Sequence, residues 1–554
     1  MTPDQVFDRI ESADRPEIWI ELRDRQDVLA EIATVDPTLP LAGLLFAVKD
    51  NIDVEGLPTT AAAPTYTYLP TSDATVIARL RAAGAVVVGK TNMDQFATGL
   101  VGTRSPFGAV RNAWAPNRIS GGSSSGSAVA VALGMVDFAL GTDTAGSGRV
   151  PAALNGIVGV KPTKGLVPIT GVVPACYTQD CVTVFARDLG LSRTVVEIMA
   201  GPDAADPLSR PGVDMPAVPR RPRIAVPTPE HLDGLAPGWR EAFGSAVETF
   251  RKTGAEIVEV DITPLLDAAK LLYEGAFVAE RYAAVGEHIE QHASELDPTV
   301  ASIILAGKNK TAAEWAADTA RLAEFGSAGD ALLKNCAALL TPTTTWHPTL
   351  EDIAADPIGA NSRMGRFTNF ANLLDKAAIA IPAGMVNGTP FGVMLTGPAF
   401  SDSQLADLAQ RFLNPELEIF VVGAHLAGQP LNWQLVQAGG TLVAATQTAA
   451  QYRLHALDTV PPKPGLQRVT SGGSHIAGEV WRLPAAGFGT FVAAIPGPMV
   501  IGSVVLSDGT TVSGFLAEPF ALEGAPDISQ FGGWRSYLAS ASSATTPERE
   551  PAKV

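Results

Sequence analysis

The sequence predicts an α/β protein with two domains: a large one in which helices flank a mixed or parallel central sheet, and a smaller β-rich α+β domain. Three observations predict this. Strand-like apolar runs alternate with helix-like runs in the first part of the chain. Short β-rich runs separated by turns follow from residue 416. The chain has 554 residues, which is too long for one hydrophobic core.

The first predicted domain covers residues 1–415. Its first elements are read from hydrophobic periodicity, and prolines close the opening segment. They are a helical segment (residues 3–34), a buried strand (44–48) that leads directly into Lys49, a helix (74–83) and a second strand (85–88). A proline-rich surface connection (residues 202–222) follows. After it come a mostly helical region (238–340), two strands (377–381 and 392–395) and a helix (403–412).

The second predicted domain covers residues 416–540. Strands are predicted where β-branched and aromatic residues cluster between turn residues, as at Asp508-Gly509. These strands are expected at residues 419–422, 490–495 and 501–506. Residues 541–554 carry little apolar surface to bury, so they are predicted to be disordered.

Composition excludes several classes of function. The formal net charge of −17 argues against nucleic acid and against anionic membrane surfaces as partners. No apolar run reaches the roughly 20 residues that span a bilayer. The three cysteines form no CxxC pair and there is no HExxH motif, so we expect no metal site and no cofactor. Free cysteines and the absence of a signal-peptide pattern predict a reducing cytoplasm.

Residues 121–148 are rich in glycine and serine and carry the chemistry. A flexible linker would have this composition, but the apolar run Ala128 to Leu140 predicts a buried helix between two glycine clusters. A phosphate-binding loop is a second alternative, and the segment lacks GxxxxGK[ST]. A glycine-rich turn that ends in serine suits an oxyanion site, whose donors would be the backbone N–H groups of Thr144, Ala145, Gly146 and Ser147.

A serine nucleophile in this turn needs a base. All seven histidines lie beyond residue 230, and none has a recognisable triad context. A lysine can serve if burial lowers its pKa, because desolvation disfavours the ammonium form. Lys49, at the end of an apolar strand, is the candidate, although a lone lysine after a strand is usually solvated.

Four motifs occur in one order along the chain: FAVKDNIDVEG, GGSSSGSA, GTDTAGSGRVPA and GVKPTKGLVP, at residues 46–56, 121–128, 141–152 and 159–168. Together they resemble the amidase signature family. The resemblance implies Ser147 as nucleophile, Ser123 as bridging serine and Lys49 as base. Lys90 is a second lysine on a buried strand, outside the motif that carries the base. Ala145 stands where the family more often has glycine, which keeps the N–H donor.

The TDTAGSGRVPA variant and the C-terminal extension resemble the allophanate hydrolase subgroup. The opening VVGAHLAG of the extension also resembles gamma-glutamyl cyclotransferase-like folds. The subgroup resemblance implies allophanate as substrate, with Arg281 holding its carboxylate and Tyr273 donating its hydroxyl. Helical spacing alone favours another interpretation, a surface arginine and a core tyrosine.

The resemblance also implies an acyl-enzyme route to ammonia and carbon dioxide, in which the second domain assists decarboxylation. His475 and Glu479 are its candidate polar residues. Three alternatives remain: a general amidase, a glutamine-hydrolysing amidotransferase subunit, and a non-catalytic assembly subunit. We expect a homodimer because it is the commonest oligomer. Urea carboxylase or the enzymes of cyanuric acid breakdown would be functional partners.

Overall fold

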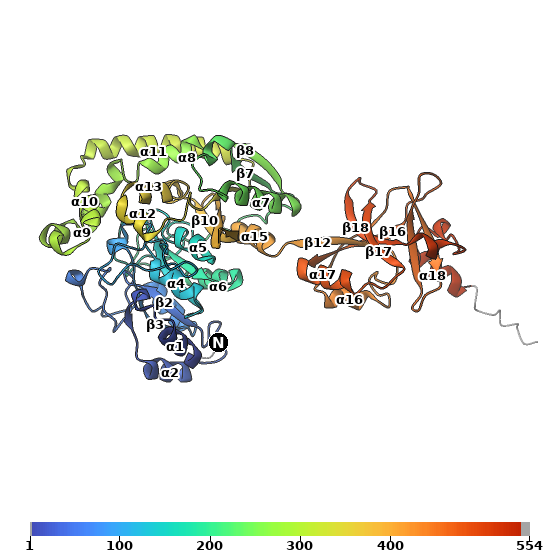
Figure 1. Cartoon of the computed structure of the whole chain (residues 1–554), viewed down its shortest axis with the longest axis horizontal. Helices are drawn as coiled ribbons and strands as arrows, with labels where there is room; N and C mark the ends of the chain where they lie inside the picture. Colours follow the sequence, from blue (N-terminus) through green and yellow to red (C-terminus); the bar gives the residue numbers. More distant parts are fainter. Residues whose placement is uncertain (1–2, 544–554) are drawn as a thin grey trace, which may run out of the picture. The chain divides into compact units, whose positions relative to one another are not determined.

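The computed structural model describes residues 3–543, which form two units, each with its own core. The first unit extends to Leu413 and the second begins at Asn414 (Figure 1). The boundary lies two residues before the predicted one. Within residues 3–543 no helix is long and apolar enough to cross a membrane.

An 11-stranded sheet in the order β1-β3-β2-β4-β6-β5-β10-β11-β9-β7-β8 forms the centre of the first unit. β2 pairs in parallel with β3 and β4, whereas β4 pairs antiparallel with β6, so the predicted mixed sheet is confirmed. The strands are β1 (Trp19–Leu22), β2 (Leu45–Lys49), β3 (Val86–Thr91), β4 (Phe138–Asp143), β5 (Val158–Lys161), β6 (Cys181–Ala186), β7 (Arg223–Pro227), β8 (Glu256–Val260), β9 (Ala338–Pro342), β10 (Ala377–Val386) and β11 (Thr389–Gly397).

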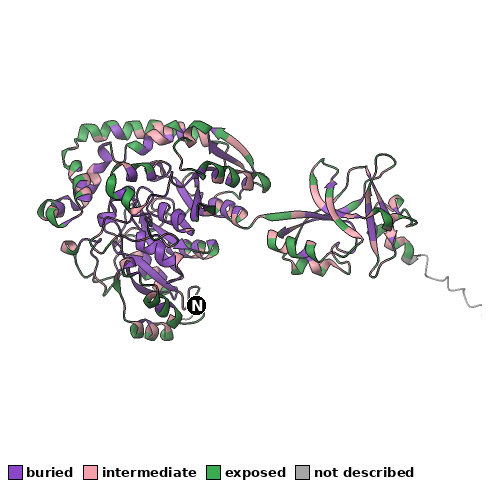
Figure 2. Cartoon of the chain, viewed as in Figure 1, coloured by how far each residue is buried: buried purple, intermediate pink, exposed green. Residues whose placement is uncertain are grey.

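Helices cover this sheet, and Figure 2 shows buried strands beneath partly exposed helices. They are α1 (Pro3–Ser12), α2 (Arg25–Thr34), α3 (Thr75–Ala82), α4 (Ser125–Ala132), α5 (Val150–Asn155), α6 (Leu189–Met199), α7 (Trp239–Lys252), α8 (Thr263–Lys270), α9 (Ala279–His292), α10 (Pro298–Ala306), α11 (Ala312–Leu333), α12 (Leu350–Ala355), α13 (Gly359–Met364), α14 (Phe370–Leu373) and α15 (Asp402–Leu413). The predicted surface connection, residues 202–222, contains no helix or strand.

The alternation of side chains along β2 decides where its last residue points. Leu45 and Ala47 pack in the core beneath α1, α2 and α4, whereas Phe46 and Val48 pack in the core beneath α3 and α6. Successive strand residues face opposite sides of a sheet. Lys49 therefore shares the side of Leu45 and Ala47, which is the side of the α4 helix.

The second unit contains a five-stranded sheet in the order β13-β16-β12-β18-β17 and a separate β14-β15 pair, so the predicted β-rich character is confirmed. The strands are β12 (Glu416–Val421), β13 (Thr441–Gln447), β14 (Tyr452–Leu457), β15 (Lys463–Arg468), β16 (Ala477–Pro484), β17 (Met499–Val505) and β18 (Thr511–Ala517), and the helices are α16 (Asn432–Gln437), α17 (Ala485–Ala493) and α18 (Trp534–Ser543). Its core is built around Phe420, Tyr452, Trp481 and Phe515.

Two predicted helical segments are interrupted. Residues 3–34 form α1 and α2 with the edge strand β1 between them, because Trp19 and Ile20 belong to a strand that pairs with β3 rather than continue a helix. In the run 128–140 the helix α4 ends at Ala132. Gly134 then turns the chain with φ 68°, and β4 begins at Phe138.

Two predictions for the C-terminal part are also corrected. Residues 490–495, predicted as a strand, belong mostly to the helix α17, whose alanine-rich start favours a helix. A short apolar run does not distinguish the two structures by periodicity. Of the predicted disordered tail 541–554, the first three residues end α18, and residues 544–554 lie outside the described residues.

Candidate active site

Lys49, Ser123 and Ser147 meet inside the first unit. The three come from the end of β2, the turn before α4 and the turn after β4, and at most 2% of any of them is exposed. Lys49 Nζ lies 2.8 Å from Ser123 Oγ, and Ser123 Oγ lies 2.9 Å from Ser147 Oγ. The Gly122–Ser123 peptide is cis. A continuous chain of hydrogen bonds thus joins the amine to both hydroxyls.

Thr142 provides the second contact of the Lys49 amine, which sequence reasoning missed. Lys49 Nζ lies 2.7 Å from Thr142 Oγ1. Both partners of the amine are therefore hydroxyls, which donate or accept as their protons rotate. A neutral Lys49 can accept a proton from Ser123 while Thr142 still holds the amine in position.

The electrostatic surroundings favour a neutral amine. Burial lowers the pKa of Lys49 to about 7, and the nearby Arg281 guanidinium acts in the same direction. The carboxylates of Asp94, Asp180 and Asp143 act in the opposite direction and limit the fall in pKa. A substantial fraction of Lys49 is therefore unprotonated at neutral pH.

A buried ion pair shapes the turn that carries Ser147. Asp143 accepts hydrogen bonds from the N–H groups of Gly146 and Gly148, both at 2.9 Å, and pairs with Arg149 at 2.8 Å. Although burial alone would raise it, the Arg149 guanidinium keeps the pKa of Asp143 below its usual value. The ion pair therefore remains charged and fixes both ends of the turn.

The turn leaves three of the four predicted oxyanion donors available. Within residues 3–543 the amides of Thr144, Ala145 and Ser147 have no acceptor, whereas the Gly146 N–H donates to Asp143. Gly146 has φ 138°, and a Cβ there would lie 2.4 Å from Thr368 Oγ1, so the position requires glycine. The neighbouring Ala145, which stands where the family more often has glycine, has its carbonyl held by Thr368 Oγ1 at 2.7 Å.

A second buried lysine lies on the neighbouring strand. Lys90 Nζ lies 3.4 Å from the Asp50 carboxylate and donates to Thr59 Oγ1 at 3.0 Å. Both members of the ion pair are completely buried. Burial lowers the pKa of Lys90 and raises that of Asp50. Lys90 is thus paired with a carboxylate rather than with a nucleophile.

Arg281 and Tyr273, the two residues predicted to bind the substrate, are in contact with each other. Arg281 Nη2 lies 3.2 Å from the Tyr273 hydroxyl, and Nη1 donates to Thr98 Oγ1 at 2.9 Å. The guanidinium carbon also lies 5.1 Å from the centre of the Tyr273 ring. Arg281 is 1% exposed, and its Nε has no partner within residues 3–543. A buried guanidinium with no ion pair in the described chain can hold an anion.

Asp180 is a further buried group that sequence reasoning missed. It accepts from Thr144 Oγ1 at 2.5 Å and from Ala175 N at 2.8 Å. Burial raises the pKa of Asp180 to about 6. Nothing in the local sequence signals this contact, since Thr144 and Asp180 are 36 residues apart.

His475 and Glu479, the predicted candidates of the second unit, both have hydrogen-bond partners within the unit. His475 Nδ1 lies 2.6 Å from Thr448 O. Glu479 is 3% exposed and accepts from Ala427 N at 2.8 Å and Arg535 Nη2 at 2.8 Å. Both side chains are therefore engaged with backbone or with an ion pair.

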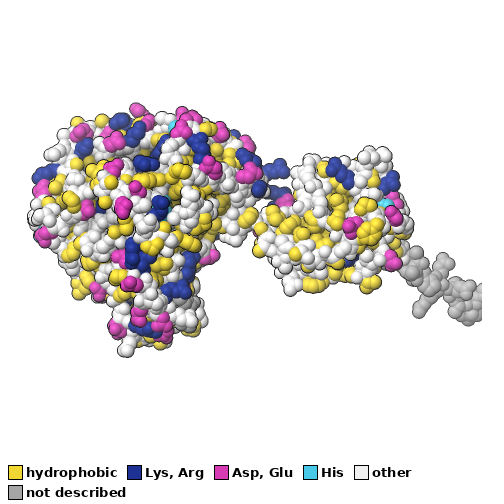
Figure 3. All heavy atoms as spheres, in the orientation of Figure 1, with side chains coloured by type: hydrophobic (Ala, Val, Ile, Leu, Met, Phe, Trp, Pro, Cys, Tyr) yellow, Lys and Arg dark blue, Asp and Glu magenta, His cyan; other side chains and the backbone are white. Residues whose placement is uncertain are grey.

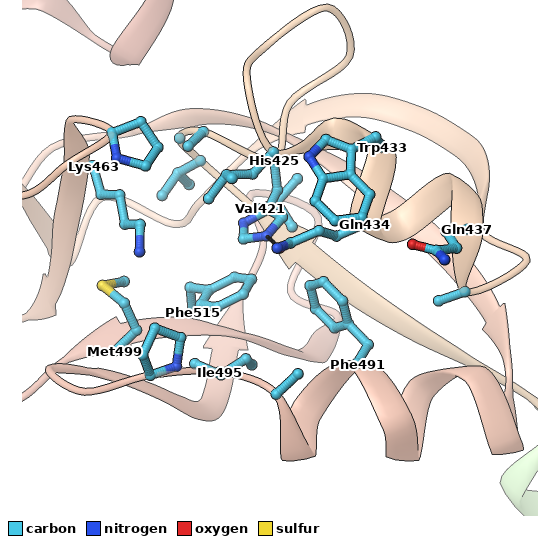
Figure 4. A pocket seen from close by; sticks show the side chains of 18 of the residues that line it. Val421, His425, Trp433, Gln434, Gln437, Lys463, Phe491, Ile495, Met499 and Phe515 are labelled. Atoms are coloured by element: carbon cyan, nitrogen blue, oxygen red, sulfur yellow. Dashed lines mark hydrogen bonds between the residues drawn. The ribbon is translucent and has the colours of Figure 1, made fainter.

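A cavity of about 570 Å³ lies elsewhere in the second unit, and neither His475 nor Glu479 lines it. His425 and Lys463 line it together with apolar and aromatic side chains (Figure 4). The His425 ring stacks on Phe515 at 5.0 Å, and its Nε2 lies 2.8 Å from Gln434 Oε1. The cavity thus combines an imidazole and an ammonium in one space.

Two further features of the described residues concern possible metal ligands and surface charge. Among residues 3–543 no group of three or more His, Cys, Asp or Glu side chains could hold a metal ion. On the face seen in Figure 3, lysine and arginine side chains lie among aspartate and glutamate rather than in one basic patch. The arrangement that can act chemically is a buried amine that reaches a serine through a second serine.

Comparison with known proteins agrees with this geometry. The Amidase family model matches residues 9–406, and the model described as Allophanate hydrolase C-terminal domain matches residues 417–539. The urea amidolyase of Saccharomyces cerevisiae is 41% identical over 572 residues, which covers 94% of this chain but 31% of that protein. The chain also spans 30% of the Lachancea kluyveri urea amidolyase.

Two further relatives cover the chain differently. The structure of Kluyveromyces lactis allophanate hydrolase is 41% identical with a TM-score of 0.69, covering 98% of this chain and 97% of that one. A glutamyl-tRNA(Gln) amidotransferase protein of Symbiobacterium thermophilum is 34% identical and covers 67% of this chain and 82% of that protein. The protein therefore belongs to the amidase family, through a domain that fills most of its first unit.

Proposed function

We propose that this protein hydrolyses allophanate, with Ser147 as nucleophile, Ser123 as proton bridge and Lys49 as base. The main support for these roles is the buried chain of hydrogen bonds from the Lys49 amine through Ser123 to the Ser147 hydroxyl. The similarity to an allophanate hydrolase over nearly the whole of both chains supports the choice of substrate. Allophanate is a urea that bears a carboxylate, and Arg281 provides for it a buried guanidinium that has no ion pair within residues 3–543.

The acylation step follows from the direction of proton movement. Neutral Lys49 takes the proton of Ser123, which takes that of Ser147 as Ser147 Oγ attacks the terminal amide carbonyl. The negative charge that develops on the carbonyl oxygen would be stabilised by the free amides of the 144–147 turn. The relay then returns a proton to the leaving nitrogen, and ammonia departs.

Deacylation reverses the relay with water as the nucleophile. Lys49 and Ser123 take a proton from the water, the ester to Ser147 breaks, and the hydroxyl is regenerated. The product is an amine that carries two carboxylates. Loss of one carbon dioxide leaves carbamate, which breaks down to ammonia and a second carbon dioxide.

The substrate assignment is tested by Arg281→Gln measured against two substrates. For allophanate, kcat/KM should fall about 100-fold, because two charge-assisted hydrogen bonds to the carboxylate are lost. For a neutral aliphatic amide, assayed well above the acid limb set by Lys49, it should change little. Ser147→Ala should reduce ammonia release from both by about 10,000-fold or more. Equal losses on both substrates in Arg281→Gln would contradict the carboxylate role, and faster turnover of glutamine than of allophanate would favour the amidotransferase alternative.

The functional setting follows from the same relatives. The urea amidolyases contain this region within a longer protein, so we propose that the chain works together with a urea carboxylase activity that supplies allophanate. Breakdown of cyanuric acid is the alternative source. We further propose a homodimer in the cytoplasm. Size-exclusion chromatography with light scattering tests the dimer.

For the second unit we propose assistance in the loss of carbon dioxide from the dicarboxylated product. The cavity supports this role better than His475 and Glu479 do, because those side chains are already engaged. Among the residues that line the cavity there is no aspartate or glutamate to pair with Lys463. The Lys463 ammonium suits a small dianion, which it would bind by charge-assisted hydrogen bonds. Burial lowers the pKa of His425, so the neutral imidazole would be a hydrogen-bond partner of the bound anion, and the proton that its nitrogen gains on loss of carbon dioxide would come from water.

Full-length Lys463→Met and His425→Asn variants test this role, with His475→Asn as the control. Release of the first ammonia should be unchanged in all three. Release of the second should slow at pH 8 in the two cavity variants only. If only His475→Asn slowed release of the second ammonia, the assisting site would lie at His475 rather than in the cavity.

A further inference from the structure

Asp180 lies where the nucleophile turn meets the chain segment 174–180. Its carboxylate accepts from Thr144 Oγ1 at 2.5 Å, from Ala175 N at 2.8 Å and from Cys176 N at 3.2 Å. Thr144 begins the turn that ends at Ser147. One buried carboxylate therefore holds the turn against a second piece of backbone.

The segment that Asp180 holds is itself fixed on two other sides. Asn372 Nδ2 donates to Gln179 O at 3.0 Å and to Asp143 O at 2.7 Å, which ties the segment to the end of β4. Thr178 donates to the Glu280 carboxylate through its amide at 2.8 Å and its hydroxyl at 2.7 Å. The segment is therefore a rigid support rather than a free loop.

We propose that Asp180 is a positioning residue for the reaction: it fixes the Thr144 side chain and so orients the three free amides of the 144–147 turn. This inference rests on the proposed function of Ser147 as nucleophile. The amides of Thr144, Ala145 and Ser147 have no acceptor in the described chain. Asp143 holds the Gly146 and Gly148 amides of this turn, and Asp180 adds a second anchor through the Thr144 hydroxyl at the start of the donor set.

The ionisation of Asp180 agrees with this role. Burial raises the pKa of Asp180 to about 6, so the carboxylate is still the major form at pH 7 and accepts all its donors. Arg281 faces it from α9 and lowers its pKa, and Lys49 lies within the electrostatic reach of Asp180. None of these groups replaces Asp180 as the acceptor for Thr144.

The experiment uses Asp180→Asn, Thr144→Val and their double variant. The asparagine keeps the shape but presents a donor to backbone amides, and the valine removes only the hydroxyl. Each single variant should lower kcat and the rate of Ser147 labelling by a fluorophosphonate about 10- to 100-fold, with KM within about threefold, because misoriented donors stabilise the transition state less. The double variant should lose no more than the worse single one. Thr144→Ser, which keeps a hydroxyl for Asp180, should recover most of the labelling rate that Thr144→Val loses.

Asp36→Asn is the matched control, since Asp36 accepts from Thr38 N at 2.9 Å and Thr38 Oγ1 at 2.8 Å on the surface. It should label at the wild-type rate. Wild-type labelling in Thr144→Val, or losses that multiply in the double variant, would overturn the inference. If Asp180→Asn does not fold by circular dichroism, Thr144→Val decides. The labelling rate needs no substrate, so failure of allophanate as substrate would not be mistaken for failure of this inference.

Discussion

Two lysines stand on neighbouring parallel strands and are equally buried, yet their surroundings differ. Lys49 ends β2, and its amine contacts the hydroxyls of Ser123 and Thr142. Lys90 in β3 lies 3.4 Å from the Asp50 carboxylate. Burial lowers the pKa of both lysines. What separates them is the chemistry of their nearest partners.

The difference teaches that burial alone does not make a lysine into a base. An amine whose partners are hydroxyls can pass protons along them, because each hydroxyl both donates and accepts. An amine opposite a buried carboxylate is stabilised by that charge, and removing either partner leaves the other without compensation. Lys49 is thus suited to chemistry and Lys90 to holding its strand.

Activity gives the largest expected contrast. Lys49→Met should reduce kcat about 10,000-fold, because the relay loses its proton acceptor, whereas Lys90→Met should change kcat less than about tenfold. Steady-state ammonia release and fluorophosphonate labelling of Ser147 both measure this. Comparable losses in the two folded variants would mean that Lys90 takes part in the proton relay and that the comparison is wrong.

The motif residues of this centre could be predicted because each belongs to a local pattern. An apolar strand ends at Lys49, and two glycine clusters surround Ser123 and Ser147. The alternation of side chains in β2 then explains why Lys49 points towards α4. Similarity of motifs supplied their order of action, which spacing alone did not.

The missed features depend on contacts between distant residues. Asp180 reaches Thr144 across 36 residues, and nothing near either one signals the contact. The Gly146 amide donates to the Asp143 side chain, three residues earlier in the same turn, and the sequence gives no sign of this hydrogen bond. In the second unit, part of α17 was predicted as a strand because a short apolar run fits either structure.

Stability should reverse the ranking of the two lysines. Lys90→Met leaves Asp50 buried without its cation and should cost about 3–5 kcal/mol of the free energy of unfolding. Lys49→Met removes a desolvated amine and should cost no more than about 1 kcal/mol, as functional groups are often held at the expense of stability. Urea unfolding, followed through the transition of the first unit, measures both.

A double variant isolates the ion pair. Adding Asp50→Asn to Lys90→Met removes the uncompensated carboxylate and should recover part of the lost stability, whereas Asp50→Asn alone should also destabilise. Lys49→Met as unstable as Lys90→Met would show that the hydroxyl partners matter to folding as much as the carboxylate does.

The pH profile of the wild type reports Lys49 directly. The active form is the neutral amine, and the pKa of Lys49 is about 7, so kcat/KM should fall as pH drops below 7 and level off above it. The fall should approach tenfold per pH unit, and it should steepen below about pH 6, where Asp180 also becomes protonated. A profile that stays flat down to pH 5.5 would contradict a lysine base.

The charged neighbours of Lys49 should move this profile in opposite directions, which is the smallest effect and the most specific. Arg281 lowers the pKa of Lys49, so Arg281→Gln should shift the acid limb to higher pH. Asp180 raises it, so Asp180→Asn should shift the limb to lower pH. Both shifts should stay below about one unit, since Asp94 and Asp143 remain. As a control, Lys90→Met should leave the acid limb in place, because Lys90 pairs with Asp50 and not with the relay. If Arg281→Gln and Asp180→Asn shifted the limb in the same direction, the limb would belong to a group other than Lys49.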